Sequence, residues 1–293
     1  SGLFTQGMVN HATFRDSEGN WVEPQNVINT NDNKAERADT GLPVEIGRVE
    51  KMSKSKKNTV DPTDVIEHYG ADTARWFILS DSPPDRDMEW TNAGIEGAFR
   101  YINRVARIID DRLSLIGVPK TTIPEEFSSV ALELRQITHK TILGITGDYE
   151  NFHFNKSVAR LYELTNAISA VDLDNLKYDV SWAIRESLET LVRLLSPMTP
   201  HLAEDMWQKL GHKTLLTDMM WPNAEKSLIA DNKVTLAVQV GGKLRGTIDV
   251  EAGIKKQNAE ELAHSVPNVQ ASIGERKIRK IIFVPDKLVN FVV

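Results

Sequence analysis

The spacing of apolar residues changes once along this chain, and that change limits the folds it can adopt. Between about 93 and 225, apolar side chains recur every three or four residues, first at Phe99, Ile102 and Val105. This spacing places them on one face of an α-helix. After residue 233 apolar residues instead alternate with polar ones, which is typical of β-strands. We therefore predict a multidomain α+β fold.

The helical part holds several amphipathic segments in succession. Further apolar stripes run through 134–145, 158–171 and 182–195, and Thr199 followed by Pro200 predicts the N-cap and first turn of another helix. Each stripe must be buried against another one. We therefore predict an antiparallel helical bundle over the whole of 93–225.

The C-terminal part, residues 230–293, has the pattern of a small mixed module. Gly241 and Gly242 interrupt the alternation and can supply the positive φ of a two-residue hairpin turn. One helix is expected near 258–264. The predicted strands are residues 234–240, 244–250, 278–284 and 288–293. This order gives a ββαββ arrangement.

The first 60 residues begin with a short apolar segment and then become polar. Leu3, Phe4, Met8 and Val9 carry the apolar part, which we interpret as a strand. The Asn-, Asp- and Gly-rich residues that follow predict an irregular, turn-rich insert.

Residues 61–92 are expected to form a connecting helical segment. Its longer helix is predicted to begin with Asp72 as the N-cap and to end before Pro83 and Pro84. Arg75 lies three residues after Asp72, so we expect an ion pair rather than a catalytic pair.

Composition excludes some classes of protein. The 293 residues include no cysteine, so disulfides and cysteine metal sites are excluded. No apolar run of about 18 residues is present, and we expect no membrane span and a cytoplasmic location. The formal net charge is −6, but ten Lys and Arg stand against six Asp and Glu from Lys233 onward. A local basic patch of this kind is compatible with nucleic-acid binding.

The most specific motif is Lys-Met-Ser-Lys-Ser (KMSKS) at residues 51–55, followed by Lys56 and Lys57. Ammonium groups separated by small hydroxyl residues suit a loop that surrounds a triphosphate, because they neutralise charge and donate hydrogen bonds. A lysine cluster alone would more often be a solvated basic loop or a localisation signal. The specified pentapeptide favours the nucleotide site.

This pentapeptide is the second signature of class I aminoacyl-tRNA synthetases, and the chain resembles the bacterial leucyl-tRNA synthetase family most closely. The resemblance includes Gly-Ile-Glu-Gly-Ala at 94–98 and Val-Gln-Val-Gly-Gly-Lys at 238–243. Further matching positions are 6–9, 61–62, 69–75, 89–90, Arg100, 197–201, Glu204 and Trp207. The resemblance implies that residues 1–60 end a Rossmann-like catalytic domain with a leucine-specific insert. It also implies that the bundle is of the anticodon-binding type.

Two parts of that family have no counterpart here. The His-x-Gly-His signature of the first catalytic half does not occur, and nothing resembles the editing domain. The chain therefore resembles the C-terminal third of the enzyme, and we expect it to be inactive alone.

The resemblance implies a two-step reaction with ATP, Mg²⁺, leucine and tRNA-Leu. Lys54 corresponds to the lysine that stabilises charge on pyrophosphate, so we assign it the catalytic role. Lys51, Met52, Ser53 and Ser55 would form the ATP-binding loop around it. Lys56 and Lys57 are weaker candidates because lysines after the signature are often only solvated.

Two sets of basic residues are candidates for tRNA contact. Arg100 and Arg104 lie four residues apart on one predicted helix face and can meet the phosphate backbone together, although Arg100 can instead pair with Glu96. The resemblance indicates that the C-terminal module also contacts tRNA; the alternative is a solvated surface. Its candidate residues are Lys243, Arg245, Lys277, Arg279 and Lys280.

No metal site is predicted. His201 and Glu204 have a spacing compatible with a shared helix face, but two ligands do not make a site, so we interpret them as structural.

The sequence leaves other functions and families possible for the whole chain. It could be a stand-alone tRNA-binding module without catalysis, or part of a valyl-, isoleucyl- or methionyl-tRNA synthetase, since these share the signature and a helical bundle. The segments at 94–98 and 238–243 favour leucine. We expect a monomer.

Overall fold

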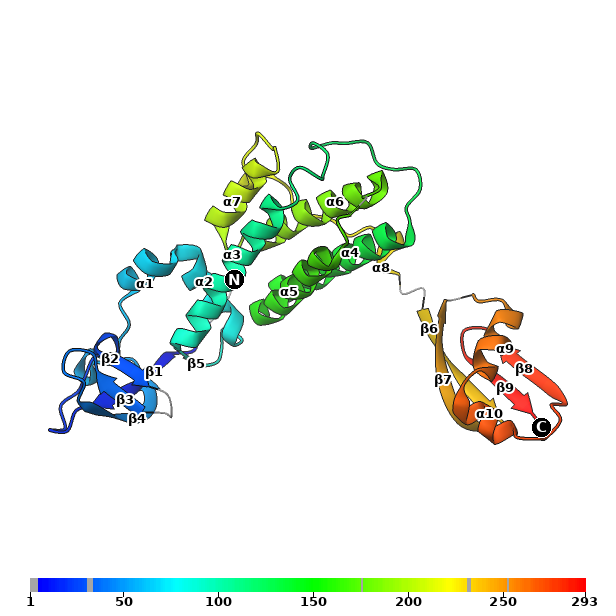
Figure 1. Ribbon diagram of the computed structural model, residues 1–293, viewed down its shortest axis with the longest axis horizontal. Coiled ribbons are helices and arrows are strands. Elements are labelled where there is room, and N and C mark those ends of the chain that lie inside the picture. The colour runs from blue at the N-terminus through cyan, green and yellow to red at the C-terminus, as the bar shows by residue number, and fades with distance from the viewer. Residues whose placement is uncertain (1–4, 31–33, 175, 231–232, 252) are drawn as a thin grey trace. The chain divides into compact units, whose positions relative to one another are not determined.

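The computed structural model describes residues 5–30, 34–174, 176–230, 233–251 and 253–293. The predicted apolar start at Leu3 and Phe4 lies outside the described residues. The chain divides into two compact units, Ser1–Ile229 and Ala230–Val293 (Figure 1). Each unit has its own apolar core.

The first unit starts with a sheet that has the strand order β2-β3-β4-β1-β5 among the described residues. β1 is antiparallel to β4 and parallel to β5. The strands are β1 Val9–Arg15, β2 Val27–Thr30, β3 Lys34–Arg37, β4 Pro43–Lys51 and β5 Met88–Glu89, with a short 3-10 helix, η1 Pro24–Asn26, before β2.

The predicted irregular insert is only partly right: residues 16–20 form a turn, but residues 27–30 and 34–37 pair as antiparallel strands. The sequence analysis missed these strands because they bury few side chains. Among the buried ones, Ala35 and Val44 lie in a small cluster with Phe14 and Val22. A strand that is solvated on most positions does not show strong apolar alternation.

Two helices, α1 Pro62–Tyr69 and α2 Ala71–Asp81, lie between β4 and β5 in the chain. Asp61 caps α1 by accepting a hydrogen bond from the Thr63 amide at 2.8 Å. Gly70, at φ 85°, separates the two helices and occupies the N-cap position of α2. Asp72 is thus not the N-cap of its own helix. As predicted, α2 ends before Pro83 and Pro84.

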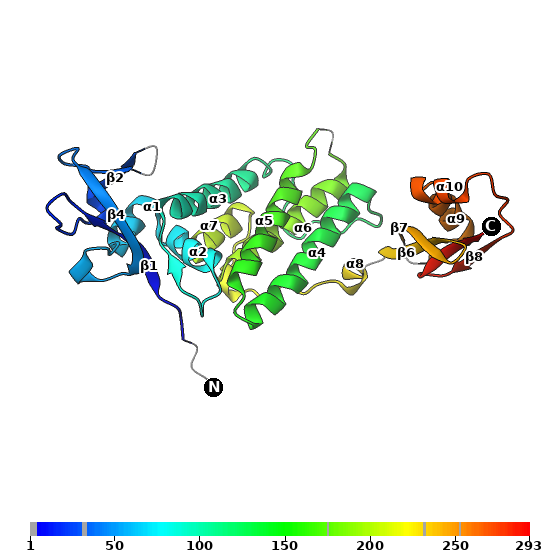
Figure 2. The same cartoon turned by 90° about the horizontal axis from the view of Figure 1, so that it is seen from below.

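The predicted helical bundle is confirmed. Its helices are α3 Asn92–Asp110, α4 Ser129–Glu150, α5 Phe154–Ala170, α6 Tyr178–Leu195 and α7 Pro200–Lys209. Helices α4, α5 and α6 lie side by side (Figure 2). Their contact is lined by fully buried Ile145, Leu161, Leu164, Ile184 and Leu188. Burying aliphatic side chains of this size is worth about 1.5–3 kcal/mol each, so the stripes are core.

Asp72 caps a helix other than its own. Its carboxylate accepts hydrogen bonds from the Leu202 amide at 2.7 Å and from His201 Nδ1 at 2.9 Å, so it caps α7 from α2. The predicted pair with Arg75 is present at 3.0 Å. Thr199 does occupy the N-cap position of α7, but its hydroxyl instead donates to the Leu195 carbonyl at 3.2 Å.

The rest of the first unit is a short 3-10 helix, η3 Leu216–Asp218, and α8 Lys226–Ile229. Glu204 accepts hydrogen bonds from the Leu216 and Thr217 amides at 2.8 and 2.9 Å. His201 and Glu204 therefore bind different partners within the first unit.

The second unit is a sheet with the strand order β7-β6-β9-β8, against which two helices pack. Its elements are β6 Lys233–Val240, β7 Lys243–Glu251, α9 Lys256–His264, α10 Pro267–Ile273, β8 Lys280–Val284 and β9 Leu288–Val292. The hairpin turn is confirmed, with φ 58° at Gly241 and 77° at Gly242.

The second helix of this unit was not predicted. Helix α10 begins at Pro267, two residues after Ser265, the C-cap of α9. Its short apolar side consists of the buried residues Val269 and Ile273. Seven residues are too few to show a helical period in the sequence.

No helix in the described part of the chain has the length and apolar character needed to cross a membrane. Nor do its His, Asp and Glu residues form a group of three or more that could hold a metal ion.

Candidate functional site

The lysine-rich motif forms a compact loop between β4 and α1. Lys51 is the last residue of β4, and residues Lys54–Lys56 form a short 3-10 helix, η2. Ser53 caps η2, because its hydroxyl accepts from the Lys56 amide at 3.4 Å. Lys57 has φ 52° and its amide donates to the Lys54 carbonyl at 3.3 Å, which closes the turn. We call residues 51–57 the lysine loop.

The lysines of this loop differ in their partners. Lys51, Lys54 and Lys57 are exposed, and no ion pair joins their ammonium groups to any described residue. Lys56 is half-buried and forms an ion pair with Glu50. Ser55 Oγ lies 3.3 Å from Ser53 Oγ. The loop thus exposes three ammonium groups that no described carboxylate compensates, while the charge of Lys56 is compensated by Glu50.

Met52 anchors the loop on its apolar side. Its amide donates to the Val9 carbonyl at 3.3 Å, and its side chain packs against the main core of the first unit. A cavity of about 220 Å³ adjoins it. The residues that line this cavity are Val9, Met52, Val60, Pro62, Val65, Ile66, Ala74, Ile78 and Trp90.

One polar residue that supports the loop was given no role by the sequence. Asn58 is fully buried and its side chain hydrogen-bonds to the loop and to both strands below it. A polar residue three positions before Asp61, the cap of α1, was the only available signal. That signal does not separate a buried amide from an ordinary turn residue.

The two candidate arginines of the bundle both lie on α3 and both have partners. Arg100 pairs with Glu96 at 3.8 Å, which is the alternative that the sequence left open. Arg104 donates to Ser169 Oγ on α5 at 3.2 Å. The Arg100 side chain is 71% exposed, so its ion pair is weak and can be exchanged for another anion.

The candidate cations of the second unit are all exposed but do not form one cluster. We call Lys243, Arg245, Lys277, Arg279 and Lys280 the C-terminal cations. Lys243 and Arg245 lie on β7, whereas only Lys280 lies on β8, and these strands are the opposite edges of the sheet. Three strand spacings separate the edges by roughly 14 Å.

The strand predicted over residues 278–284 begins two residues later, at Lys280. Lys277 and Arg279 precede β8, although the Arg279 amide already donates to the Val292 carbonyl at 2.8 Å. None of the C-terminal cations forms an ion pair with a described residue.

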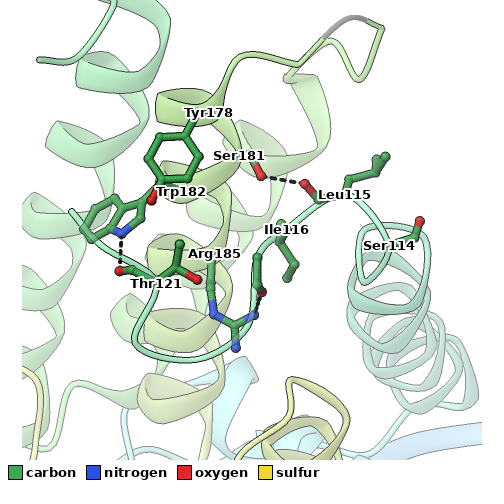
Figure 3. A pocket seen from close by; sticks show the side chains of 9 residues that line it. Ser114, Leu115, Ile116, Thr121, Tyr178, Ser181, Trp182 and Arg185 are labelled. Atoms are coloured by element: carbon green, nitrogen blue, oxygen red, sulfur yellow. Dashed lines mark hydrogen bonds between the residues drawn. The ribbon is translucent and has the colours of Figure 1, made fainter. Parts of the chain in front are cut away.

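A cavity of about 310 Å³ at the end of the bundle has a structural explanation (Figure 3). Trp182 Nε1 donates to the Thr121 carbonyl at 3.2 Å. Arg185 donates to the Gly117 carbonyl, and Ser181 to the Leu115 carbonyl. These side chains of α6 hold the loop between α3 and α4, so we assign them no ligand.

Comparison with protein families matches two parts of the chain. A family described as "Anticodon-binding domain of tRNA ligase" matches residues 132–260. A second, described as "tRNA synthetases class I (I, L, M and V)", matches residues 43–91, which include the lysine loop.

Individual relatives match over the whole chain. The leucine–tRNA ligase of Parvibaculum lavamentivorans is 48% identical over 296 residues, covering 100% of this chain and 34% of the relative. That of Rhodospirillum rubrum is 47% identical over 293 residues, again with 34% of the relative covered. The chain thus spans about a third of the length of these relatives.

The fold agrees with a solved structure of the same kind. A crystal structure of the Agrobacterium radiobacter K84 LeuRS in a ternary complex with tRNA and LeuAMS aligns with a TM-score of 0.68. It is 24% identical and covers 99% of this chain and 33% of that chain, which supports the class I synthetase fold. From end to end, this chain is therefore homologous to about a third of the length of bacterial leucine–tRNA ligases, and residues 43–91 match a class I tRNA synthetase family.

Proposed function

We propose that this chain is part of an enzyme that joins leucine to tRNA-Leu in two steps. Leucine and ATP first give leucyl-adenylate and pyrophosphate, and the leucyl group then passes to the terminal adenosine of the tRNA. The observation that carries this proposal is the lysine loop, which exposes uncompensated ammonium groups on an anchored backbone.

In this proposal Lys54 is the catalytic residue. Its ammonium would stabilise the negative charge that accumulates on pyrophosphate as the α-phosphorus bond to the leaving oxygen breaks. Lys51, Ser53 and Ser55 would bind the triphosphate, and Met52 would position the loop through its apolar contacts. Lys56 has the weakest claim to a phosphate contact because Glu50 compensates it.

Mg²⁺ is proposed only as a companion of ATP. The described residues form no group that could hold a metal ion, so no step is assigned to an ion held by this chain. Mg²⁺ in nucleotide sites is commonly bound through substrate phosphates.

The two other regions are proposed to bind tRNA. We infer a bundle domain over 93–225 and a C-terminal domain over 230–293, connected to the catalytic part (1–60) by residues 61–92. Arg100 and Arg104 would contact the phosphate backbone from α3, and the C-terminal cations would contact it from the second unit. We further propose a monomer in the cytoplasm.

Leucine-dependent exchange of pyrophosphate into ATP tests this proposal. A full-length ligase containing this segment is expected to catalyse the exchange, and the chain alone is expected not to. Exchange that does not depend on leucine, or clear turnover by the chain alone, would contradict the proposal.

A second candidate, a tRNA-binding module without catalysis, is favoured by the match of residues 132–260 to an anticodon-binding family. Passing total bacterial tRNA over the immobilised chain separates the candidates further. Enrichment of leucine tRNAs would show that the bundle and the second unit recognise tRNA unaided. Equal retention of all tRNAs would place specificity in the rest of the enzyme.

A further inference from the structure

Asn58 is buried, unlike an ordinary surface or turn residue. Its side chain is fully buried, directly after the exposed lysine loop. Burying an amide costs free energy unless its donors and acceptor are all used. The contacts of Asn58 meet this requirement and connect three separate pieces of backbone.

The side-chain amide of Asn58 forms hydrogen bonds both to the loop and to the sheet. Its Oδ1 accepts from the Ser53 amide at 2.8 Å. Its Nδ2 lies 3.2 Å from the carbonyls of His11 and Glu50 and 3.4 Å from that of Lys51. Because one side meets an N–H and the other meets carbonyls, the orientation of the amide is determined by its partners.

These partners lie where the strand pairing ends. His11 on β1 is opposite Glu50 on β4, and the lysine loop leaves the sheet directly after them. The Nδ2 group therefore fixes the base of the loop to both strands, while Oδ1 holds its first turn at Ser53. Within the loop the bonds are few and long, at 3.4 Å for Lys56 to Ser53 and 3.3 Å for Lys57 to Lys54.

We propose that Asn58 is a positioning residue that holds the base and first turn of the lysine loop, from which Lys54 reaches the triphosphate. This inference rests on the proposed activation of leucine with ATP. A charged donor held in place before the reaction stabilises the transition state more than one that must first be ordered. An amide is suited to this role because aliphatic residues lack both the acceptor for Ser53 and the donors for the strand carbonyls.

The test combines two variants and a neighbouring control. Asn58→Ala removes all four contacts. Asn58→Asp keeps the acceptor for Ser53 but places a carboxylate against three carbonyl oxygens. Thr59→Ala removes the exposed hydroxyl of the next residue and serves as the control. In this chain, hydrogen exchange of the loop amides reports positioning directly, independently of any activity.

We expect at least about tenfold faster exchange of the Ser53 amide in both variants, with protection of the bundle amides unchanged. Thr59→Ala should exchange like the wild type. For Asn58→Asp, protection relative to the wild type at the same pH should partly return as the pH falls, because the protonated carboxyl regains a donor. Unchanged loop protection in both variants would overturn the inference, as would equal loss of protection in the bundle.

In a full-length ligase, Asn58→Ala should lower kcat for pyrophosphate exchange by about 10-fold to 100-fold, with KM for ATP changed by less than about threefold. A purely structural residue would lower the amount of folded enzyme but not kcat per folded molecule, and that result would also overturn the inference. An inactive wild-type ligase would instead contradict the proposed function, and the hydrogen-exchange comparison would still decide whether Asn58 positions the loop.

Discussion

The lysine loop and the C-terminal cations both expose positive charge, but their backbones are held in different ways. The buried side-chain amide of Asn58 holds the base of the loop, and Lys56 in the loop is paired with Glu50. The C-terminal cations project from the two edges of a hydrogen-bonded sheet and the segment that precedes one edge. From this difference we expect two uses of charge: a single group at a defined point in the loop, and several interchangeable groups on the second unit.

The largest effect is expected at Lys54. Lys54→Ala in a full-length ligase should slow leucine-dependent pyrophosphate exchange by about 10²- to 10³-fold, because one donor to the transition state is lost. Steady-state exchange kinetics measure it. Lys57→Ala, which removes an exposed charge three residues away, is the matched control and should stay within about threefold. Equal losses in the two variants would mean that the loop acts through total charge.

A smaller effect is expected when the C-terminal cations are neutralised together. Replacing all five by Gln should weaken tRNA binding by about 10-fold to 100-fold near 0.1 M salt and flatten the dependence of log K on log salt. Filter binding over a salt series measures both quantities. Single replacements should each contribute a minor share, so one replacement that alone abolished binding would contradict the interchangeable arrangement.

The turn that joins β6 and β7 should be sensitive to its backbone conformation. Gly242 has φ 77°, and Gly242→Val should destabilise the second unit by about 1–2 kcal/mol, since a β-branched residue is strained there. Hydrogen exchange of the β6 amides measures the loss. Gly242→Asn is the matched control, because asparagine tolerates positive φ, and it should cost clearly less. Equal costs would show that side-chain size matters more than φ.

The smallest effect concerns the corresponding turn of the lysine loop, where a lysine takes the strained position. Lys57 has φ 52°, so Lys57→Gly should stabilise the loop, by at most about 1 kcal/mol. Protection of the Lys57 and Asn58 amides measures the change, and Lys57→Ala, which keeps a Cβ, separates it from loss of charge. Faster exchange in Lys57→Gly than in Lys57→Ala would contradict this reading of the turn.

Much of the fold followed from apolar periodicity. The stripes through Ile102, Leu161 and Leu188 correctly predicted bundle helices, and alternation around Gly241 correctly predicted the hairpin. Elements with little apolar pattern were missed. Strands β2 and β3 bury few side chains, and α10 is only seven residues long. Periodicity reports burial, so an element that buries little, or is very short, cannot be found by it.

The sequence by itself determined the family resemblance, the position of the lysine motif and the helical or strand character of the long segments, because these depend on residues close together in the chain. Only the tertiary structure decided the partners of polar groups that lie far apart in the chain. Asp72 caps α7 across 130 residues, Asn58 reaches the carbonyl of His11 across 47, and Lys280 lies on the opposite sheet edge from Lys243. A hydrogen bond or a strand order depends on how distant segments pack, and no local pattern of residues encodes that arrangement.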